Sequence, residues 1–299
     1  MMKELCIYLE PDLRKSAEAG EHNFINLVQD VADKSLFRVT YHDQPTVKGG
    51  DDTYTLSHMT APPPDRGLVF RRAYQYPFWN IEATTERWQW DVAKASFDPA
   101  IIHPDAKRFY TYWQKRIFGA AAARTTKSGY IYVPLQGRLT EHRSFQRCSP
   151  IEMIEHCLEH GGTRPVVACL HPNETYSTAE LAALDDLVRR FGQLSVETGK
   201  MEHHLQHCDF VVSQNSAAAF AGYFFGKPAL LFGKIDFHHI AEPANMAQLP
   251  DSFDSAATAR PAFDRYVHWF WQENCINAGR VDARAKILAR FQRFGWPIE

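Results

Sequence analysis

The sequence predicts an α/β fold, with a Rossmann-like arrangement of parallel strands and helices over the carboxy-terminal half. The first observation is that, from Tyr130 onward, short apolar runs of strand length alternate with amphipathic segments of helix length, which is typical of βαβ units. The second is that 299 residues, 45% of them hydrophobic, suffice for two modest cores. The third is that residues 119–129 contain small and basic side chains but no large apolar ones. We therefore expect two α/β domains, with the boundary at 119–129.

The strands and helices of the carboxy-terminal half are predicted from apolar runs and from the residues that separate them. Strands are expected at 130–135, 166–170, 194–196, 210–213 and 229–232, because each is a short apolar run. Helices are expected between them at 150–160, 178–191, 201–207 and 217–225. The helix at 178–191 has the clearest start, because Ser177 and Glu180 form a capping-box pattern ahead of apolar residues at helical spacing. Two further helices are expected at 261–275 and 282–294.

The amino-terminal half is less regular and rich in aromatic residues. Strand-like runs occur at 5–9, 37–41 and 68–70, and Phe24, Leu27, Val28 and Val31 repeat at helical spacing. A further helix is expected at 105–118. We expect an acceptor-side domain over residues 1–120 and a nucleotide-sugar-binding domain over residues 129–299.

Charge and cysteine content exclude some classes of function. The formal net charge of −2 and the pI near 6.7 indicate no binding of nucleic acid, so an anion site must be local. The six cysteines are scattered without a CxxC pair and are expected to be reduced and packed in the core. Neither a signal peptide nor a membrane span is evident. We expect a cytoplasmic protein, with peripheral membrane association left open.

The segment VVACLHPNE, residues 166–174, places His171 and Pro172 directly after a buried strand. Ligands of open α/β sheets bind beyond the carboxyl ends of the strands. Pro172 stops the strand and fixes the turn, and an imidazole at this position can donate to a phosphate oxygen or transfer protons. The alternative is that His171 only fills the end of the strand.

The segment from Phe210 to Gly233 reads as a strand, a polar turn, a helix of small residues and another strand. In the turn, Ser213, Asn215 and Ser216 lie at a helix amino terminus, where free N–H groups and the helix dipole favour a phosphate. Helix capping alone also selects such residues. We predict that this turn and His171 share one phosphate site within a few ångströms.

The order of motifs over residues 130–240 resembles the capsular polysaccharide Kdo-transferase family. The motifs are PLQ, HP and SxNS, followed by a helix of small residues and then by GKP, a hydrophobic run and Gly. The HP and serine elements also resemble the more distant bacterial sialyltransferases. The resemblance implies a GT-B-like fold of two Rossmann-like domains with a ligand cleft between them. It implies a metal-independent glycosyltransferase of capsule polysaccharide biosynthesis, without a cofactor, that moves a Kdo-like or sialic-acid-like sugar from a CMP-sugar to a glycan. His171, Ser213 and Ser216 would hold the CMP phosphate, with Gln136 at the cleft.

The sequence departs from this family pattern after the PLQ strand, where Gly137 to Thr140 precede the first acidic residue, Glu141. The resemblance implies that the amino-terminal domain binds the acceptor and, as often in GT-B enzymes, supplies the catalytic carboxylate. We predict Glu21 and Glu82 in the amino-terminal half, because an acidic residue there could deprotonate an acceptor hydroxyl. Lys200, at the end of the 194–196 strand, is expected to contact the nucleotide.

Three alternatives remain open on the sequence. The first is a GT-B enzyme that uses a UDP-sugar, either a transferase or an epimerase, which would share the scaffold. The second is a noncatalytic relative that binds a nucleotide or a glycan. The third is a zinc site, because His203 and His207 are spaced four apart ahead of Cys208.

Overall fold

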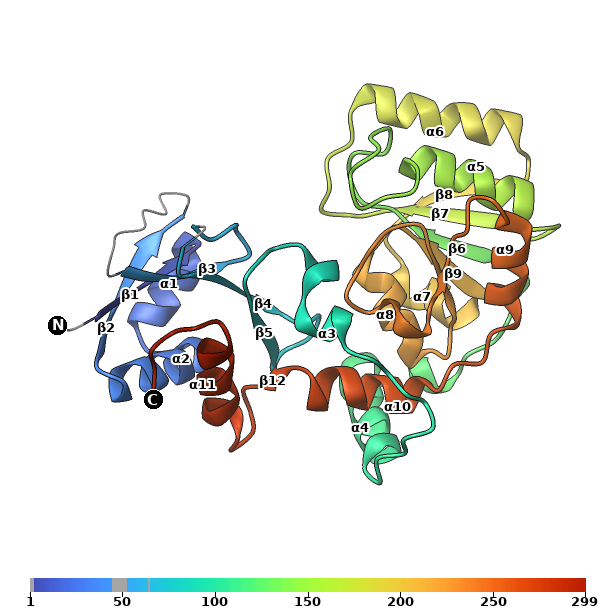
Figure 1. The fold of residues 1–299 in the computed structure, drawn as a ribbon. Coiled ribbons are helices and arrows are strands. Elements are labelled where there is room, and N and C mark those ends of the chain that lie inside the picture. Colours follow the sequence, from blue (N-terminus) through green and yellow to red (C-terminus); the bar gives the residue numbers. More distant parts are fainter. Residues whose placement is uncertain (1–2, 45–52, 64) are drawn as a thin grey trace. The chain divides into compact units, whose positions relative to one another are not determined.

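The computed structural model describes residues 3–44, 53–63 and 65–299. The chain forms two compact units (Figure 1). Unit 1 contains Met1–Ala95 and Trp269–Glu299, and unit 2 contains Ser96–His268. Each unit has its own six-stranded sheet flanked by helices, which confirms the predicted α/β class with two Rossmann-like domains.

The sheet of unit 1 contains β1 (Lys3–Leu9), β2 (Phe37–Asp43), β3 (Thr53–His58), β4 (Gly67–Arg72), β5 (Phe78–Glu82) and β12 (Ile276–Asn277), in the order β12-β5-β4-β3-β1-β2. β1 is parallel to β2 and β3, and β3 is parallel to β4. These four strands therefore have their carboxyl ends at one edge. β5 runs antiparallel to β4, and β12 runs antiparallel to β5.

Two helices of unit 1 bring the start and end of the chain together. The apolar residues that predicted the first helix, Phe24, Leu27, Val28 and Val31, are buried. Ile287 and Phe291, near the end of the chain, belong to the same core. The helices of unit 1 are α1 (Pro11–Glu18), α2 (Asn23–Lys34), α3 (Asp91–Lys94) and α11 (Ala283–Arg293), with short helices η1 (Arg87–Gln89) and η4 (Trp269–Glu273). α11 packs on α2, so the last residues belong to the first unit.

The sheet of unit 2 contains β6 (Ile131–Pro134), β7 (Val166–Leu170), β8 (Leu194–Thr198), β9 (Phe210–Ser213), β10 (Ala229–Leu231) and β11 (Glu242–Pro243), in the order β11-β10-β9-β6-β7-β8. All neighbouring pairs are parallel. The chain starts at β6 in the middle, continues outward through β7 and β8, and then returns to β9 on the other side of β6. This reversal makes the carboxyl ends of β6 and β9 the topological switch point of the sheet.

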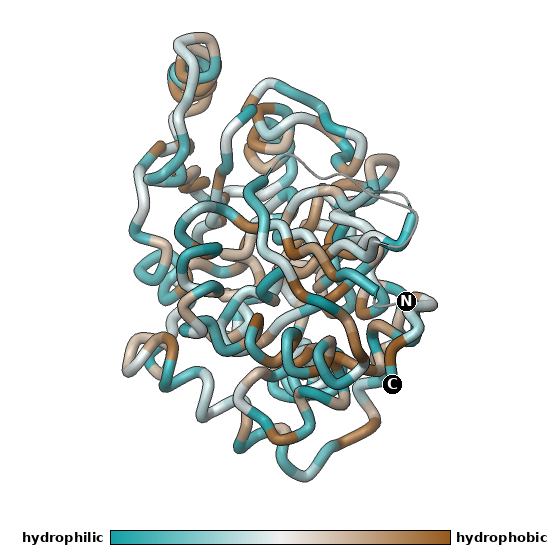
Figure 2. The backbone as a smooth tube through the Cα atoms, turned by 90° about the vertical axis from the view of Figure 1, so that its left-hand side faces the viewer, coloured by the Kyte–Doolittle hydropathy of each residue, from teal (hydrophilic) through white to brown (hydrophobic). Residues whose placement is uncertain are grey.

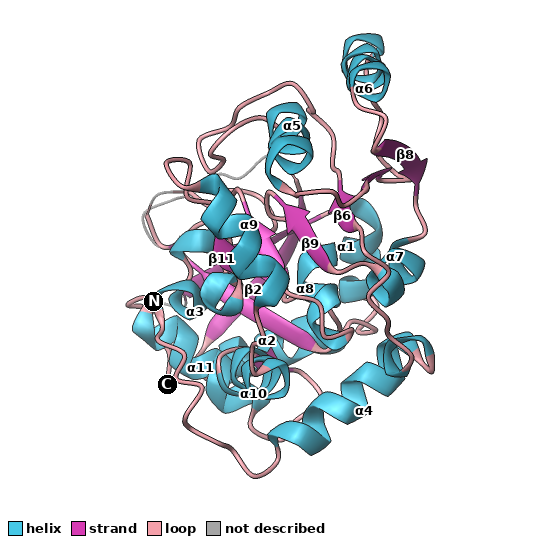
Figure 3. Cartoon of the chain, turned by 90° about the vertical axis from the view of Figure 1, so that its right-hand side faces the viewer, coloured by secondary structure: helices cyan, strands magenta, loops and turns pink. Residues whose placement is uncertain are grey.

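Helices cover both faces of this second sheet (Figure 3). On one face Ile131 and Val133 belong to the core that α5, α6 and α9 complete. On the other face Tyr132 stacks on His204 of α7, because successive side chains of a strand point to opposite faces. The helices of unit 2 are α4 (Ala106–Phe118), α5 (Pro150–His160), α6 (Thr178–Arg190), α7 (Met201–His207), α8 (Ala217–Phe224), α9 (Leu249–Thr258) and α10 (Phe263–His268), with η2 (Ala121–Ala123) and η3 (His238–Ile240).

The hydropathy of the chain matches this layering. In Figure 2 the helices alternate between hydrophilic and hydrophobic residues, as helices with one buried face do. All six cysteines are buried and free, which confirms that they pack as small apolar residues. None of the helices in the described ranges is long and apolar enough to span a membrane.

The units have different bounds from the domains predicted at 1–120 and 129–299. The helix α4 packs in unit 2, where Tyr110 donates to the carbonyl of Tyr223 at 2.8 Å. The helix expected at 261–275 divides at the boundary between the units, because α10 ends at His268 and η4 begins at Trp269. The change in composition at residues 119–129 comes just before β6, the first strand of the unit 2 sheet. Unit 2 itself begins earlier, at Ser96.

Candidate functional site

A small pocket lies at the switch point of the unit 2 sheet. It is formed by the residues that end β6 and β9 and by those that begin α5, together with one arginine from the loop between β6 and α5. The lining residues are Pro134, Leu135, Gln136, Arg143, Pro150, Met153, Ser213 and Gln214. The structure therefore brings two predicted donor-binding residues, Gln136 and Ser213, to one pocket.

The loop between β6 and α5 crosses the end of β9 and reaches the residues after β10. Gln146 forms an antiparallel bridge with Gly233. On either side of this bridge, the N–H of Arg147 donates to Phe232 at 2.8 Å and the N–H of Lys234 donates to Phe145 at 2.9 Å. A Cβ atom on Gly233 would lie 2.7 Å from the carbonyl oxygen of Gln214, so only glycine allows this crossing.

The predicted serine turn begins α8, and both of its hydroxyls bond to the backbone. Oγ of Ser213 accepts from the N–H of Ser216 at 3.0 Å, and Oγ of Ser216 caps the helix by accepting from Ala218 at 3.2 Å. Ser213 is only 1% exposed, and Asn215 lies half-buried between the two serines. The capping role is therefore observed, while each hydroxyl keeps its own hydrogen for a further acceptor.

Gln214 is a pocket residue that the sequence analysis did not single out. Its Nε2 donates to the carbonyl of Cys148 at 2.9 Å, and this contact fixes which end of the amide is oxygen. Its Oε1 is buried and has no hydrogen-bond partner among the described residues, and the same holds for Nε of Arg143. Two residues that line the pocket thus each carry a buried atom without a partner among the described residues, which native structures seldom leave so.

His171 and Pro172 are exposed directly after β7. The backbone N–H of His171 donates to the hydroxyl of Tyr176 at 2.8 Å, and its Nδ1 accepts from the N–H of Asn173 at 3.2 Å. A neutral ring in this state carries its hydrogen on Nε2. His171 and Ser213 share one edge of the sheet, but β6 lies between their strands, so their backbones are about 10 Å apart. The backbones of His171 and the serine turn are therefore farther apart than the few ångströms that were predicted.

Lys200 lies at the edge of the sheet, away from the switch point. It follows β8, which is separated from β6 by β7. Its side chain is exposed and pairs with Glu197 at 3.0 Å, and its backbone is left-handed with φ of 55° at the start of α7. The structure does not bring Lys200 to the pocket that Gln136 and Ser213 line.

The two predicted catalytic carboxylates lie in unit 1. Glu21 is exposed in the turn between α1 and α2, where its N–H donates to the carbonyl of Ser16 at 2.9 Å. Glu82 ends β5 and is only 3% exposed. Its carboxylate pairs with Arg290 of α11 and accepts from the N–H of Asp91 at 3.3 Å.

Burial dominates the electrostatics of Glu82. It raises the pKa of Glu82 to about 7, although the Arg290 guanidinium acts in the opposite direction. Arg290 and Arg293 also pair with Asp91 and hold the pKa of that carboxyl below its usual value, although partial burial opposes them. These contacts join β5, α3 and α11, so Glu82 has the environment of a structural ion pair.

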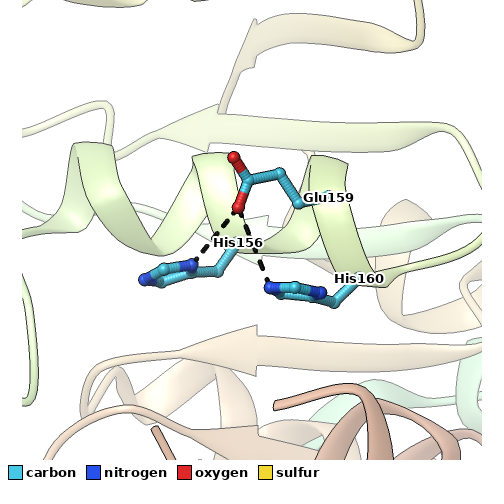
Figure 4. Close-up of side chains that lie close together, drawn as sticks. All are labelled: His156, Glu159 and His160. Atoms are coloured by element: carbon cyan, nitrogen blue, oxygen red, sulfur yellow. Dashed lines mark ion pairs between the residues drawn. The ribbon is translucent and has the colours of Figure 1, made fainter.

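The residues of the alternative zinc site, His203, His207 and Cys208, are not among the described side chains grouped closely enough to hold a metal ion. Burial raises the pKa of the Cys208 thiol to about 12, which disfavours the thiolate that binds metals. Nδ1 of His207 lies 2.9 Å from Oγ1 of Thr126. Among the described residues, the side chains grouped closely enough to hold a metal ion are instead those of His156, Glu159 and His160, on one face of α5 (Figure 4).

These three side chains already contact one another. Oε2 of Glu159 lies 3.7 Å from Nδ1 of His156 and 3.8 Å from Nε2 of His160. The group lies at the far end of α5 from the switch point, because α5 starts at Pro150 in the pocket. A metal there would not contact a ligand in the pocket.

No protein-family model matches the chain. No curated protein matches it either. Similar solved structures include the β-Kdo 2,7-transferase of Thermosulfurimonas dismutans KpsC, with 11% identity and a TM-score of 0.47 over 89% of each chain. The β-Kdo 2,4-transferase of the same KpsC has 13% identity and a TM-score of 0.45 over 90% of this chain and 98% of that one. The UDP-GlcNAc 2-epimerase of Neisseria meningitidis has 11% identity and a TM-score of 0.35 over 98% of this chain and 100% of that one. These TM-scores are low, so the function has to be inferred from the chain's own residues.

Proposed function

We propose that the chain is a glycosyltransferase that moves a Kdo-like or sialic-acid-like sugar from a CMP-sugar donor to a glycan hydroxyl. The observation that carries this proposal is the pocket at the switch point, where Gln136, Ser213 and Gln214 meet at the carboxyl ends of β6 and β9. Nucleotides bind at this point in open α/β sheets. The PLQ, HP and SxNS motifs all lie at the carboxyl ends of strands at this edge, which supports the same proposal.

The phosphate of the donor is met by protein donors in this proposal. His171 offers Nε2–H, Ser213 and Ser216 offer hydroxyl hydrogens, and Arg143 adds a positive charge at the pocket. Burial lowers the pKa of Arg143, but a guanidinium stays protonated at neutral pH. These groups neutralise a single phosphate without a bound cation. We therefore propose metal-independent binding.

Gln214 supports cytosine over uracil as the base. Its unsatisfied Oε1 can only accept a hydrogen bond. In this proposal position 4 of the base faces Oε1, where cytosine presents an amino donor and uracil presents an oxygen. Two facing oxygens would leave the buried acceptor unpaired, which costs about 1–3 kcal/mol. The pocket therefore favours CMP over UMP in this proposal.

Calorimetric titration of the full chain with CMP and with UMP tests this function. We expect CMP to bind at least about fivefold more tightly, because 1 kcal/mol corresponds to that ratio. Addition of EDTA should leave the CMP dissociation constant unchanged. A preference for UMP would favour the UDP-sugar alternative, and loss of binding with EDTA would contradict the metal-independent site. Failure of both nucleotides to bind would overturn the proposed function.

A further inference from the structure

A second group of polar side chains lies at the carboxyl edge of the parallel strands of unit 1. Glu10 directly follows β1, His58 ends β3 and Arg72 ends β4. Trp79 of β5 pairs with Arg72 in the sheet. The ring of His22, which precedes α2, lies edge-on to Trp79 with 5.4 Å between ring centroids. The fold therefore brings five residues that are far apart in the sequence to one edge.

Glu10 and His58 form a close hydrogen-bonded pair. Nδ1 of His58 lies 2.7 Å from Oε2 of Glu10. Because a carboxylate only accepts, Nδ1 carries the hydrogen and Nε2 of the neutral ring keeps its lone pair. None of the described residues bonds to Nε2. A carboxylate that orients an imidazole in this way is the arrangement of general-base pairs.

The surroundings keep this imidazole neutral. Burial lowers the pKa of His58, and Arg71 and Arg72 act in the same direction, while Glu10 opposes them. Burial also lowers the pKa of His22, and His58 and Arg72 add to that effect. The His58 side chain is 15% exposed. A neutral ring at the surface of a fold can accept a proton at neutral pH.

The neighbours of the pair offer the means to bind a sugar. The exposed guanidinium of Arg72 lies 6.0 Å from the ring centroid of Trp79 and pairs with none of the described carboxylates. Nδ1 of His22 accepts from the N–H of Ile25 at 3.2 Å, so Nε2–H of the neutral ring is the donor. Nε1 of Trp79 is buried without a partner among the described residues. An unpaired arginine suits a carboxylate or a phosphate on the bound molecule.

We propose that Glu10, His22, His58, Arg72 and Trp79 form a second site, which binds an acidic sugar and transfers the proton of one of its hydroxyls to His58. The O–H bond of the sugar breaks, the proton bonds to Nε2, and the electron pair stays on the oxygen, which becomes the nucleophile. Glu10 then faces an imidazolium. The inference rests on the proposed glycosyl transfer and gives the chemical class of its acceptor.

A matched pair of sugars tests the binding step on the full chain. Glucuronate and glucose share one ring and differ in the carboxylate, so their affinities report what Arg72 contributes. We expect glucuronate to bind about tenfold more tightly or better and to shift the ¹⁵N resonances of His22 and His58. Arg72→Gln should abolish this preference. Arg38→Gln is the control, because Arg38 is exposed near the amino end of β2.

The proton-accepting step is tested by Glu10→Gln, followed by a ¹⁵N titration of His58. Removal of the Glu10 charge should lower the pKa of His58 further, because that charge favours the imidazolium against Arg71 and Arg72. An unchanged pKa would show that the Glu10 carboxylate does not act on the His58 ring.

The outcomes separate this inference from the proposed function. CMP binding in unit 2 should be unchanged in Arg72→Gln and Glu10→Gln. Equal affinities for the two sugars, no binding of either, or a His58 pKa that does not move in Glu10→Gln would overturn the second site. Absence of CMP binding with normal glucuronate binding would instead reject the nucleotide site alone.

Discussion

The two sheets of the chain end their parallel strands with different chemistry. At the edge of unit 2, Ser213 and Gln214 present neutral hydrogen-bonding groups beside a helix amino terminus, and Arg143 adds a positive charge. At the edge of unit 1, Glu10, His58 and Arg72 present ionisable groups. Neutral donors at a helix terminus suit a phosphate, whereas an oriented imidazole suits proton transfer. In the two proposals the same architecture serves two different steps, which the residues at the strand ends distinguish.

Glu82 and Gln214 sharpen this comparison, because both are buried polar residues near a strand end. The Glu82 carboxylate is satisfied by Arg290 and by the backbone of Asp91. The amide oxygen of Gln214 has no partner among the described residues. Burial of a polar group therefore does not identify a binding site. A buried atom without a protein partner, on a residue that lines a pocket, is the better indicator, because a hydrogen bond to a bound molecule offsets its desolvation cost.

The largest effect is expected for Arg290→Ala, which tests whether Glu82 is structural. Removal of the arginine leaves a buried carboxylate without its cation, which costs about 3–5 kcal/mol in the free energy of unfolding. Urea unfolding followed by tryptophan fluorescence measures this loss. Arg284→Ala on the same helix is the control, because its pair with Asp30 is half-exposed and exposed pairs contribute about 0–1 kcal/mol.

The pH dependence gives a second readout of this variant. The folded pKa of Glu82 already lies near 7, above its ordinary value of 4.5, and loss of Arg290 raises it further. The folded state then binds more protons than the unfolded state, so stability falls as the pH rises through this range. The deficit of Arg290→Ala should therefore be larger at pH 8 than at pH 6. Equal losses of unfolding free energy in the Arg290 and Arg284 variants would show that the pair with Arg290 does not stabilise the buried Glu82 carboxylate.

The elements of unit 2 could be predicted because their signals are local. The ranges predicted for β7, β9, α5 and α7 agree with the structure, and the capping box of Ser177 and Glu180 is confirmed. Each signal depends on residues within a few positions of one another. The unit boundaries depend on long-range packing, such as the contact of Tyr110 in α4 with α8, and local patterns do not encode it.

The same distinction applies to the site. The positions of Gln136 and His171 at the sheet edge could be predicted, because His171 directly follows β7 and Gln136 comes two residues after the end of β6. Gln214 was missed because its role depends on the carbonyl of Cys148, which is distant in the sequence. The pair of Glu10 and His58 was missed for the same reason, although each directly follows or ends a strand. Local patterns could not show that Glu82, which was predicted as a catalytic residue, pairs with Arg290, because the two lie 208 positions apart.

His171→Ala tests whether the edge of unit 2 is an anion site. The variant should bind CMP about ten- to a hundredfold more weakly, since a hydrogen bond to a charged group is worth about 1.5–3 kcal/mol. The melting temperature without ligand should not change, because the side chain is exposed and its loss leaves no cavity. His203→Ala is the control, because His203 is exposed on α7. An unchanged CMP dissociation constant would remove His171 from the site.

The smallest effect is expected for Gly233→Ala, which tests whether the loop over the switch point is held by close packing. The new Cβ would lie 2.7 Å from the carbonyl oxygen of Gln214, so either the residues after β9 or those after β10, to which the crossing loop is bonded, must move. Overpacking of this kind costs about 1–3 kcal/mol, and the displaced Gln214 should weaken CMP binding as well. Gly192→Ala is the control, because its Cβ would meet nothing within 4 Å, so its stability should change little. Thermal unfolding and CMP titration of both variants measure the difference. If Gly233→Ala is as stable as Gly192→Ala and binds CMP normally, the crossing loop tolerates a side chain and does not fix Gln214 in the pocket.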